Sequence, residues 1–221
     1  MKYLSTGSNA LDELLGGGLR KGTITQFYGH YGSGKTNICL CSAYECIKDG
    51  KKALYIDTEG GLSFERLKQI TGDDFNWIIK NILLFEPSNF EEQDDIIIKR
   101  VPKVLKDVGL IVLDSAVALY RISNGEEREL SLSSMLSREM ASLLKYAREY
   151  AMPVVITNHV YSDFKSDTLK PISDSTLGYW SKIIVELRRE KTGLRKARII
   201  KHMFKEEGKE CIFRITEKGL V

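Results

Sequence analysis

A run of glycines that ends in a lysine and a threonine is the first candidate for chemistry in this sequence. It is Gly29-His30-Tyr31-Gly32-Ser33-Gly34-Lys35-Thr36. Glycines let the backbone wrap around a phosphate, and exposed amides and the start of a following helix supply positive potential. Lys35 would reach the β- and γ-phosphates and assist catalysis there, and the Thr36 hydroxyl would coordinate Mg²⁺. The spacing predicts a site for ATP with Mg²⁺, although a plain glycine turn before a helix has the same pattern.

Two acidic positions could complete such a site. Asp114 ends the apolar run 110–113, and a carboxylate at the end of a buried strand can hold Mg²⁺ beside a phosphate loop. Glu59 follows the apolar run 53–56 and could orient or deprotonate the water that attacks the γ-phosphate. Asp57 competes with Glu59 for that role. Each of these acids could instead be an ordinary turn residue.

Short apolar runs alternate with longer helical patterns along the chain. We expect strands at residues 23–28, 53–57, 82–85, 110–114, 154–158 and 183–187, and helices at 9–15, 35–48, 64–70, 90–106 and 130–150. Near-continuous apolar runs suit parallel strands that are buried on both faces. The order predicts an α/β fold with a RecA-like, mostly parallel sheet flanked by helices. Ligands of such sheets bind at the carboxyl ends of the strands, where the motifs above fall.

The C-terminal part of the chain follows a different pattern. Apolar runs at 197–202 and 211–215, joined by the polar segment 205–210, predict an antiparallel hairpin. We expect segments 121–129 and 161–176 to be loops. No internal repeat is visible, and a single ATPase core domain over residues 1–221 is the simplest organisation.

Composition favours a soluble, cytoplasmic protein with no membrane partner. Hydrophobic residues make up 43% of the chain and charged residues 29%. No apolar run approaches the roughly 20 residues of a membrane helix, and residues 1–21 lack the apolar core of a secretory signal. The four cysteines have no histidine at ligand spacing, so we interpret them as small packing residues: Cys39, Cys41, Cys46 and Cys211.

The net charge of +3 is unevenly distributed. Residues 182–205 carry nine Lys or Arg against two Glu, and residues 73–95 carry seven acids against one Lys. A strongly basic stretch is a candidate footprint for nucleic acid, although a solvated face gives the same pattern.

Further segments resemble the core of archaeal and eukaryotic RecA-family recombinases. They are Ser5-Thr6-Gly7, Leu11-Asp12-Glu13-Leu14-Leu15-Gly16-Gly17-Gly18, Gly22, Asp57-Thr58-Glu59-Gly60, Phe64-Glu65-Arg66-Leu67, Thr157-Asn158-His159-Val160 and Phe213-Arg214-Ile215-Thr216-Glu217-Lys218-Gly219. Together they are much more specific than a phosphate loop alone, and they cover almost the whole chain. Within this family the chain is most similar to the short archaeal paralogue of the RadA recombinase.

This resemblance implies roles for single residues. Glu59 takes the role of the catalytic glutamate, and Arg66 packs against the adenine unless it simply faces solvent. His159 stands where the recombinases usually have a glutamine that senses the γ-phosphate, so it is the candidate sensor; a partly buried histidine at a strand end is the alternative. The loops after Asp114 and Asn158 match the two DNA-facing loops of the recombinase core.

Three departures from the family pattern affect the expected activity. The core begins almost at residue 1, so the N-terminal DNA-binding domain and the linker that docks on the next subunit are not expected. His159 replaces the sensor glutamine. The second loop carries three acids against two bases and is a poor groove for DNA: Asp163, Asp167 and Asp174 against Lys165 and Lys170.

DNA contact is therefore expected from basic residues elsewhere. Arginines and lysines that neutralise backbone phosphates give salt-sensitive binding without sequence preference. The candidates are Arg121 and Arg128 in the first loop, and Arg188, Arg189, Arg195, Lys196, Arg198 and Lys201 in the basic segment.

These features predict an ATP- and DNA-binding accessory protein of homologous recombination and DNA repair, with a weak ATPase and little strand exchange of its own. Expected partners are single- and double-stranded DNA, a RadA-type recombinase and a Holliday-junction resolvase, and a homodimer is a further expectation. The alternatives are an active DNA-dependent strand-exchange ATPase, a KaiC-like regulatory ATPase that acts on proteins, and a nucleotide site that only stabilises the fold. Glu59 followed by two glycines lacks the paired glutamates of the KaiC group.

Overall fold

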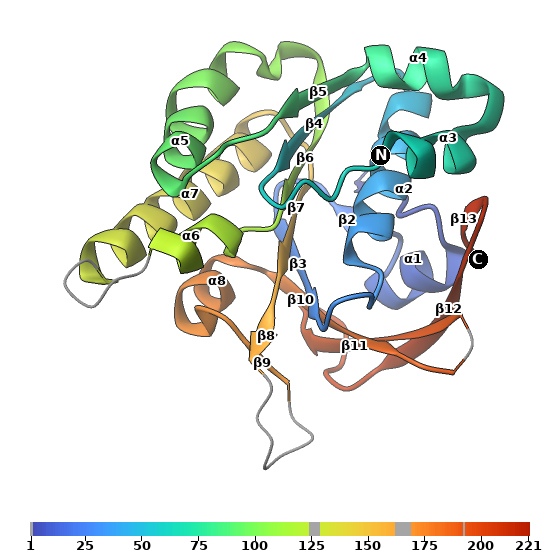
Figure 1. Cartoon of the computed structure of the whole chain (residues 1–221). Coiled ribbons are helices and arrows are strands. Elements are labelled where there is room, and N and C mark those ends of the chain that lie inside the picture. Colours follow the sequence, from blue (N-terminus) through green and yellow to red (C-terminus); the bar gives the residue numbers. More distant parts are fainter. Residues whose placement is uncertain (1, 124–128, 162–168, 192) are drawn as a thin grey trace.

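A nine-stranded sheet forms the centre of the computed structural model, which describes residues 2–123, 129–161, 169–191 and 193–221 (Figure 1). Its strand order is β13-β12-β11-β10-β3-β7-β6-β4-β5. The parallel strands are β3 (Ile24–Gly29), β4 (Lys52–Asp57), β5 (Ile82–Phe85), β6 (Val108–Asp114), β7 (Val154–Asn158) and β10 (Ile183–Arg189). The antiparallel strands are β11 (Leu194–Lys201), β12 (Glu210–Thr216) and β13 (Gly219–Leu220). Two short ribbons pair β1 (Tyr3–Leu4) with β2 (Leu19–Arg20) and β8 (Val160–Tyr161) with β9 (Lys170–Pro171).

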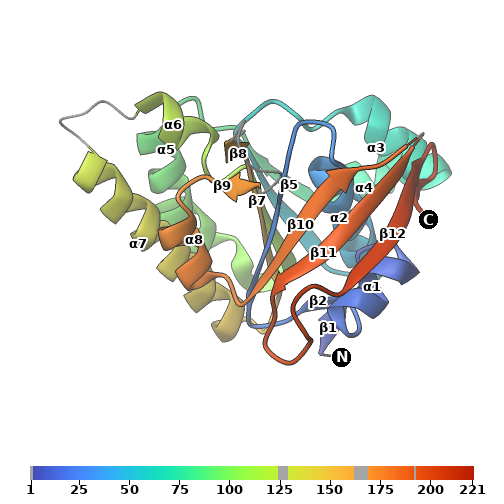
Figure 2. The ribbon, with the colours of Figure 1, turned by 90° about the horizontal axis from the view of Figure 1, so that it is seen from below.

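Helices cover both faces of the sheet (Figures 1 and 2). One face carries α1 (Asn9–Leu15), α2 (Lys35–Lys48), α3 (Phe64–Thr71) and α4 (Phe75–Lys80). The other carries α5 (Phe90–Asp95), α6 (Ala118–Ser123), α7 (Glu129–Glu149) and α8 (Asp174–Trp180). Because side chains alternate along a strand, Ala53 and Tyr55 of β4 join the first core, whereas Leu54 and Ile56 join the second. This two-faced burial explains the continuous apolar runs of the strands.

The predicted α/β class, with a mostly parallel sheet and antiparallel C-terminal strands, is confirmed. The expected continuous helix over 90–106 is wrong. α5 ends at Asp95 and is followed by a π-helical turn at Ile96–Arg100 and short 3₁₀ turns at Val101–Lys103 and Leu105–Asp107. Pro102 explains part of the difference, because proline has no N–H to donate and its ring clashes with the preceding turn of an α-helix.

The two expected loops contain more structure than the sequence indicated. α6 extends to Ser123 in the first. In the second, β9 precedes α8, which begins at Asp174. Residues 124–128 and 162–168, with Arg128, Asp163, Lys165 and Asp167, lie outside the described residues.

The cysteines are free, and three of them are fully buried in the core around α2: Cys39, Cys41 and Cys46. Cys211 is half-buried and packs against the same core. This confirms their interpretation as packing residues. None of the helices in the described ranges is long and apolar enough to cross a membrane.

The C-terminal strands should belong to the cooperative core, because Phe213 of β12 is 1% exposed while its neighbour Ile212 is 47% exposed. We expect Phe213→Ala to lower the free energy of unfolding by about 3–5 kcal/mol, as a large buried side chain leaves a cavity. Ile212→Ala is the matched control and should cost less than about 1 kcal/mol. Urea denaturation measures both; equal small effects would mean that β12 is not part of the folding unit.

Candidate functional site

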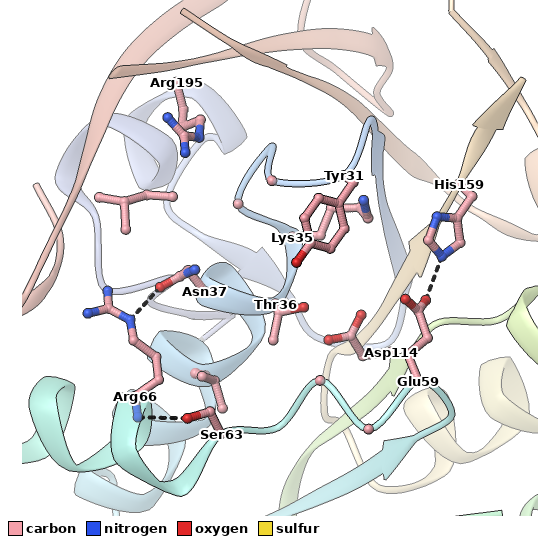
Figure 3. A pocket seen from close by; sticks show the side chains of 16 residues that line it. Tyr31, Lys35, Thr36, Asn37, Glu59, Ser63, Arg66, Asp114, His159 and Arg195 are labelled. Atoms are coloured by element: carbon pink, nitrogen blue, oxygen red, sulfur yellow. Dashed lines mark hydrogen bonds and ion pairs between the residues drawn. The ribbon is translucent and has the colours of Figure 1, made fainter. Parts of the chain in front are cut away.

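The carboxyl ends of the parallel strands meet at one edge of the sheet. Asp57 at the end of β4 pairs in register with Asp114 at the end of β6, and Tyr28 of β3 pairs with Asn158 of β7. A cavity of about 500 Å³ opens at this edge (Figure 3). Its lining includes most of the residues expected to do chemistry: Tyr31, Gly32, Gly34, Lys35, Thr36, Glu59, Arg66, Asp114 and His159.

The phosphate loop connects β3 to α2 and packs tightly against C-terminal strands. A side chain at Gly29 would collide with the carbonyl oxygen of Leu187 on β10. Gly34 has a φ of +104°, and a Cβ there would lie 2.9 Å from Ile215 Cδ1 on β12. Both positions therefore favour glycine, because of the close backbone approach at Gly29 and the left-handed backbone at Gly34.

Lys35 is the first residue of α2 and lies beneath the loop. Its Nζ donates to the carbonyl oxygens of Gly29, at 2.9 Å, and His30, at 3.2 Å. Burial lowers the pKa of Lys35, against the charges of Asp114 and Glu59, which act to raise it. A buried ammonium at a helix N-terminus suits a phosphate, which would supply the negative charge that the loop carbonyls lack.

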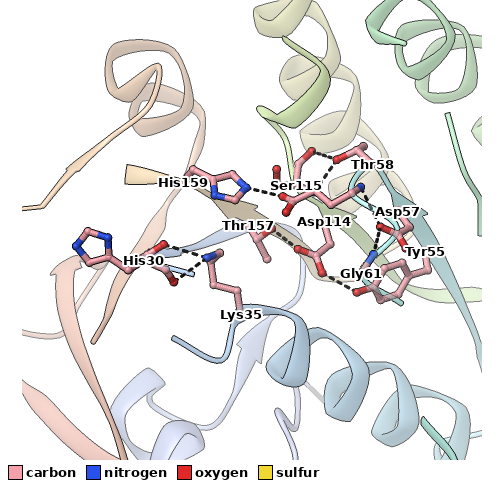
Figure 4. Close-up of polar contacts among 12 residues, drawn as sticks. His30, Lys35, Tyr55, Asp57, Thr58, Gly61, Asp114, Ser115, Thr157 and His159 are labelled. Carbon is pink, nitrogen blue, oxygen red and sulfur yellow. Dashed lines mark hydrogen bonds and ion pairs between the residues drawn. The ribbon is translucent and has the colours of Figure 1, made fainter. Parts of the chain in front are cut away.

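Asp114 is a buried carboxylate held by two hydroxyls (Figure 4). Tyr55 Oη donates to one of its oxygens at 2.8 Å, and Thr157 Oγ1 donates to the other at 2.5 Å. Burial raises the pKa of Asp114, although the hydroxyls of Thr157, Thr36 and Tyr55 oppose the shift. A carboxylate and the Thr36 hydroxyl in one cavity are the oxygen ligands that Mg²⁺ prefers, so these residues fit that ion.

Asp57 and Glu59, the two candidate acids after β4, have different environments in the structure. The Asp57 carboxylate accepts backbone hydrogen bonds from Glu59 at 3.1 Å, Gly61 at 3.1 Å and Leu62 at 2.8 Å. Asp57 is thus engaged in shaping the loop. Glu59 instead projects into the cavity, so it is the acid available for catalysis.

Glu59 and His159 are in direct contact. Glu59 Oε1 lies 2.5 Å from His159 Nε2 (Figure 3). Burial acts to raise the pKa of Glu59, but the His159 hydrogen bond and the charges of His159 and Lys35 outweigh it, so that its pKa falls below the usual value. The histidine at the sensor position therefore touches the catalytic candidate itself.

Arg66 also lines the cavity, and from α3 it forms hydrogen bonds to α2 and to the end of β12. Its Nε donates to Asn37 Oδ1 on α2 at 2.7 Å. Its two terminal nitrogens donate to the carbonyl oxygens of Thr216, at 2.7 Å, and Glu217, at 3.1 Å, in the turn after β12. It is fixed at the cavity instead of pointing freely into solvent, and its contact with adenine remains a prediction.

The basic candidates do not form one surface. Glu186 pairs with Arg188 at 2.6 Å, and Glu210 pairs with Lys196 at 3.1 Å and approaches Arg198 at 3.9 Å. Lys201 Nζ donates to the Gly178 carbonyl oxygen at 2.6 Å. Arg121 is exposed on α6, which packs on the opposite face of the sheet from α1 and α2 (Figures 1 and 2).

Of the basic candidates that the structure describes, Arg195 alone lines the cavity. The sequence had grouped it with the DNA contacts. Sequence reasoning also missed Asn37, Ser63 and Ile215, which line the cavity with it. Asn37 directly follows the phosphate-loop motif, and Ile215 lies in the recombinase-like segment 213–219, so both positions carried a signal that could have indicated them.

A family model described as Rad51 matches residues 1–221. The chain belongs to the Rad51 family. Proteins of this family are nucleotide-binding ATPases that use Mg²⁺, which agrees with the donor set around Thr36 and Asp114.

Within the Rad51 family, the chain groups with RadB. A DNA repair and recombination protein RadB of Methanosphaera stadtmanae is 47% identical over 219 residues, which are 97% of this chain and 94% of the relative. A RadB of Methanococcoides burtonii is 46% identical over 99% of this chain and 97% of its own. A crystal structure of the RadB recombinase has 39% identity, a TM-score of 0.82 and 98% coverage of both chains. The predicted resemblance is confirmed.

Asp114 should lower the stability of the metal- and nucleotide-free protein. Because its folded pKa is raised above the unfolded value of about 3.9, stability falls as pH rises from that value through the folded pKa. We expect Asp114→Asn to raise the free energy of unfolding at pH 7 by about 0.5–2 kcal/mol, and to flatten its dependence on pH.

Urea denaturation between pH 4 and 8 measures this effect. Asp57→Asn is the matched control. It should destabilise the protein, because an amide is a weaker acceptor than a carboxylate for the three backbone N–H groups. If both variants lose stability equally, burial of the Asp114 charge is not a cost to the fold.

Proposed function

We propose that this Rad51-family chain is an ATP- and DNA-binding accessory protein of homologous recombination and DNA repair, with one ATPase core domain over residues 1–221 and weak Mg²⁺-dependent turnover. The observation that carries the proposal is a single cavity lined by Lys35, Thr36, Glu59, Asp114 and His159. Those side chains come from four separate segments of the chain. Their convergence supports nucleotide chemistry more strongly than any one motif.

Each side chain has a distinct part in the proposed reaction. The loop amides and Lys35 bind the β- and γ-phosphates, and Thr36 and Asp114 hold Mg²⁺. Mg²⁺ held by Thr36 and Asp114 would supply positive charge beside the phosphates. Glu59 orients the attacking water and accepts its proton, a role that a carboxylate beside the γ-phosphate can fill.

The contact between Glu59 and His159 supports slow hydrolysis. A general base with a lowered pKa accepts a proton less readily, so the reaction gains less from it. His159 also lines the cavity, and β8 follows it directly. We infer that ATP acts mainly as a ligand whose binding shifts the conformation of the segment after His159. Slow hydrolysis would then return that segment to its nucleotide-free conformation.

The proposal of DNA and protein partners rests on the comparisons with relatives and on the basic side chains of β10 and β11. The relatives are named DNA repair and recombination proteins. Along β10 and β11, Arg188, Lys196 and Arg198 present a charged face, part of it neutralised by Glu186 and Glu210. We infer salt-sensitive binding of single- and double-stranded DNA without sequence preference. A RadA-type recombinase, a Holliday-junction resolvase and a second copy of the chain are proposed partners.

ATP turnover should be slow and indifferent to DNA. We would measure phosphate release at fixed low salt, with and without excess single-stranded DNA, and use Lys35→Ala as the blank. The variant should lose turnover, because it lacks the charge at the β- and γ-phosphates. Strong stimulation by DNA would instead favour an active strand-exchange ATPase. Absence of any DNA binding at low salt would favour a regulatory ATPase that acts on proteins.

His159→Gln should increase turnover several-fold. Removal of the histidine raises the pKa of Glu59 and makes it a stronger base, and the acid limb of the pH–rate profile should move to higher pH for the same reason. The matched control is His202→Gln, whose ring contacts the Leu15 carbonyl oxygen at 3.2 Å outside the cavity. An unchanged profile in the first variant would show that His159 does not control Glu59.

A further inference from the structure

Two arginines face each other beside the phosphate loop without a carboxylate between them. Arg189 of β10 is the direct cross-strand neighbour of Arg195 of β11. Within the described ranges, no acidic side chain forms an ion pair with either one, whereas Arg188 and Lys196 pair with Glu186 and Glu210. Like charges directly opposite one another destabilise a sheet. An external anion beside Arg195 would offset this repulsion; Arg189 itself is exposed.

The side chain of Arg195 lies over the start of α2. Arg195 shares a strand face with Ala197 and Ile199, which are buried in the core beneath that helix. Its Cγ lies 3.8 Å from the position of a Cβ on Gly34, which immediately precedes α2. Figure 3 shows Arg195 across the phosphate loop from Glu59. A helix N-terminus is where anions bind readily, because its first amides are unpaired.

The hydrogen bonds of Arg195 are incomplete. Nη1 donates to the Leu194 carbonyl oxygen at 2.9 Å, but the buried Nε has no acceptor among the described residues. Burial and the charge of Arg189 lower the pKa of Arg195. A buried donor without an acceptor is unfavourable, so an anion here would supply both an acceptor and a counter-charge.

We propose that Arg195, supported by Arg189, binds the phosphate nearest the sugar of the nucleotide. The inference rests on the proposed nucleotide site. Lys35, Arg66 and Arg195 all line one cavity, in which Lys35 would hold the outer phosphates and Arg66, by the family resemblance, would face the base. Arg195 packs over Gly34, and the phosphate that joins the sugar lies between the outer phosphates and the base. Arg195 is thus a nucleotide-binding residue, in place of the DNA contact that the sequence suggested.

Calorimetric titration of the whole protein with ATP, ADP and GTP, each with Mg²⁺, tests this role. Arg195→Gln should weaken all three by about tenfold or more, because they share the phosphate next to the sugar and lose one charge-assisted hydrogen bond. Arg195→Lys should recover part of the affinity, since it keeps the charge. The matched control is Arg214→Gln, which removes the same charge from an exposed position on β12 outside the cavity.

Two further measurements distinguish nucleotide binding from other roles. Without nucleotide, the thermal midpoint of Arg195→Gln should be unchanged or higher, because one of two repelling charges is gone. Its affinity for single-stranded DNA without nucleotide should also be unchanged. The proposal is overturned by unchanged ATP affinity, by a loss confined to ATP over GTP, or by weaker DNA binding without nucleotide.

The nucleotide site and the role of Arg195 within it can be disproved separately. If Lys35→Ala also leaves ATP affinity unchanged, the nucleotide site itself is misplaced. If Lys35→Ala abolishes ATP binding and Arg195→Gln has no effect, the site stands and only the role of Arg195 is wrong.

Discussion

Close packing of the phosphate loop against the C-terminal strands is the constraint on which the site depends. A side chain at Gly29 would strike the backbone of β10, and one at Gly34 would strike Ile215 of β12. The loop is therefore clamped between α2 and the antiparallel extension of the sheet. Because of this contact, strands that contribute nothing to the phosphate motif form a wall of the cavity.

A second constraint concerns the carboxylates at the strand ends. Three acids converge at one edge of the sheet, and each has different hydrogen-bond partners. Asp57 accepts hydrogen bonds from backbone N–H groups, Asp114 is buried between two hydroxyls, and Glu59 contacts His159. Of these three acids, Asp114 and Glu59 line the cavity. Environment, more than residue type, thus divides structural from chemical roles among neighbouring acids.

The sequence was sufficient for those parts of the fold that rest on local patterns. Strands buried on both faces leave continuous apolar runs, so the parallel core was predictable, as were the phosphate loop and Asp114. The helix over 90–106 was mispredicted because its apolar period continues through Pro102, where the backbone cannot remain α-helical. Short helices such as α8 give little periodic signal, since they span about two turns.

The site was less predictable wherever it depends on contacts distant in sequence. Strand alternation shows that Arg195 and Lys196 point to opposite faces, but not which face lies over the phosphate loop. That depends on β10 pairing beside β3, which no local pattern reveals. In the same way, the contact between His159 and Glu59 joins residues 100 positions apart.

The hydrogen bond from Arg66 to the Thr216 carbonyl spans 150 positions in the chain. Domains begin to fold from their N-terminal side during synthesis, and contacts of high sequence separation form late. A chain still being translated therefore carries the phosphate loop, Glu59 and Asp114 before it possesses Arg195 or Ile215. The cavity at the phosphate loop can therefore be completed only after the strands that follow residue 183, which carry Arg195 and Ile215, have been synthesised.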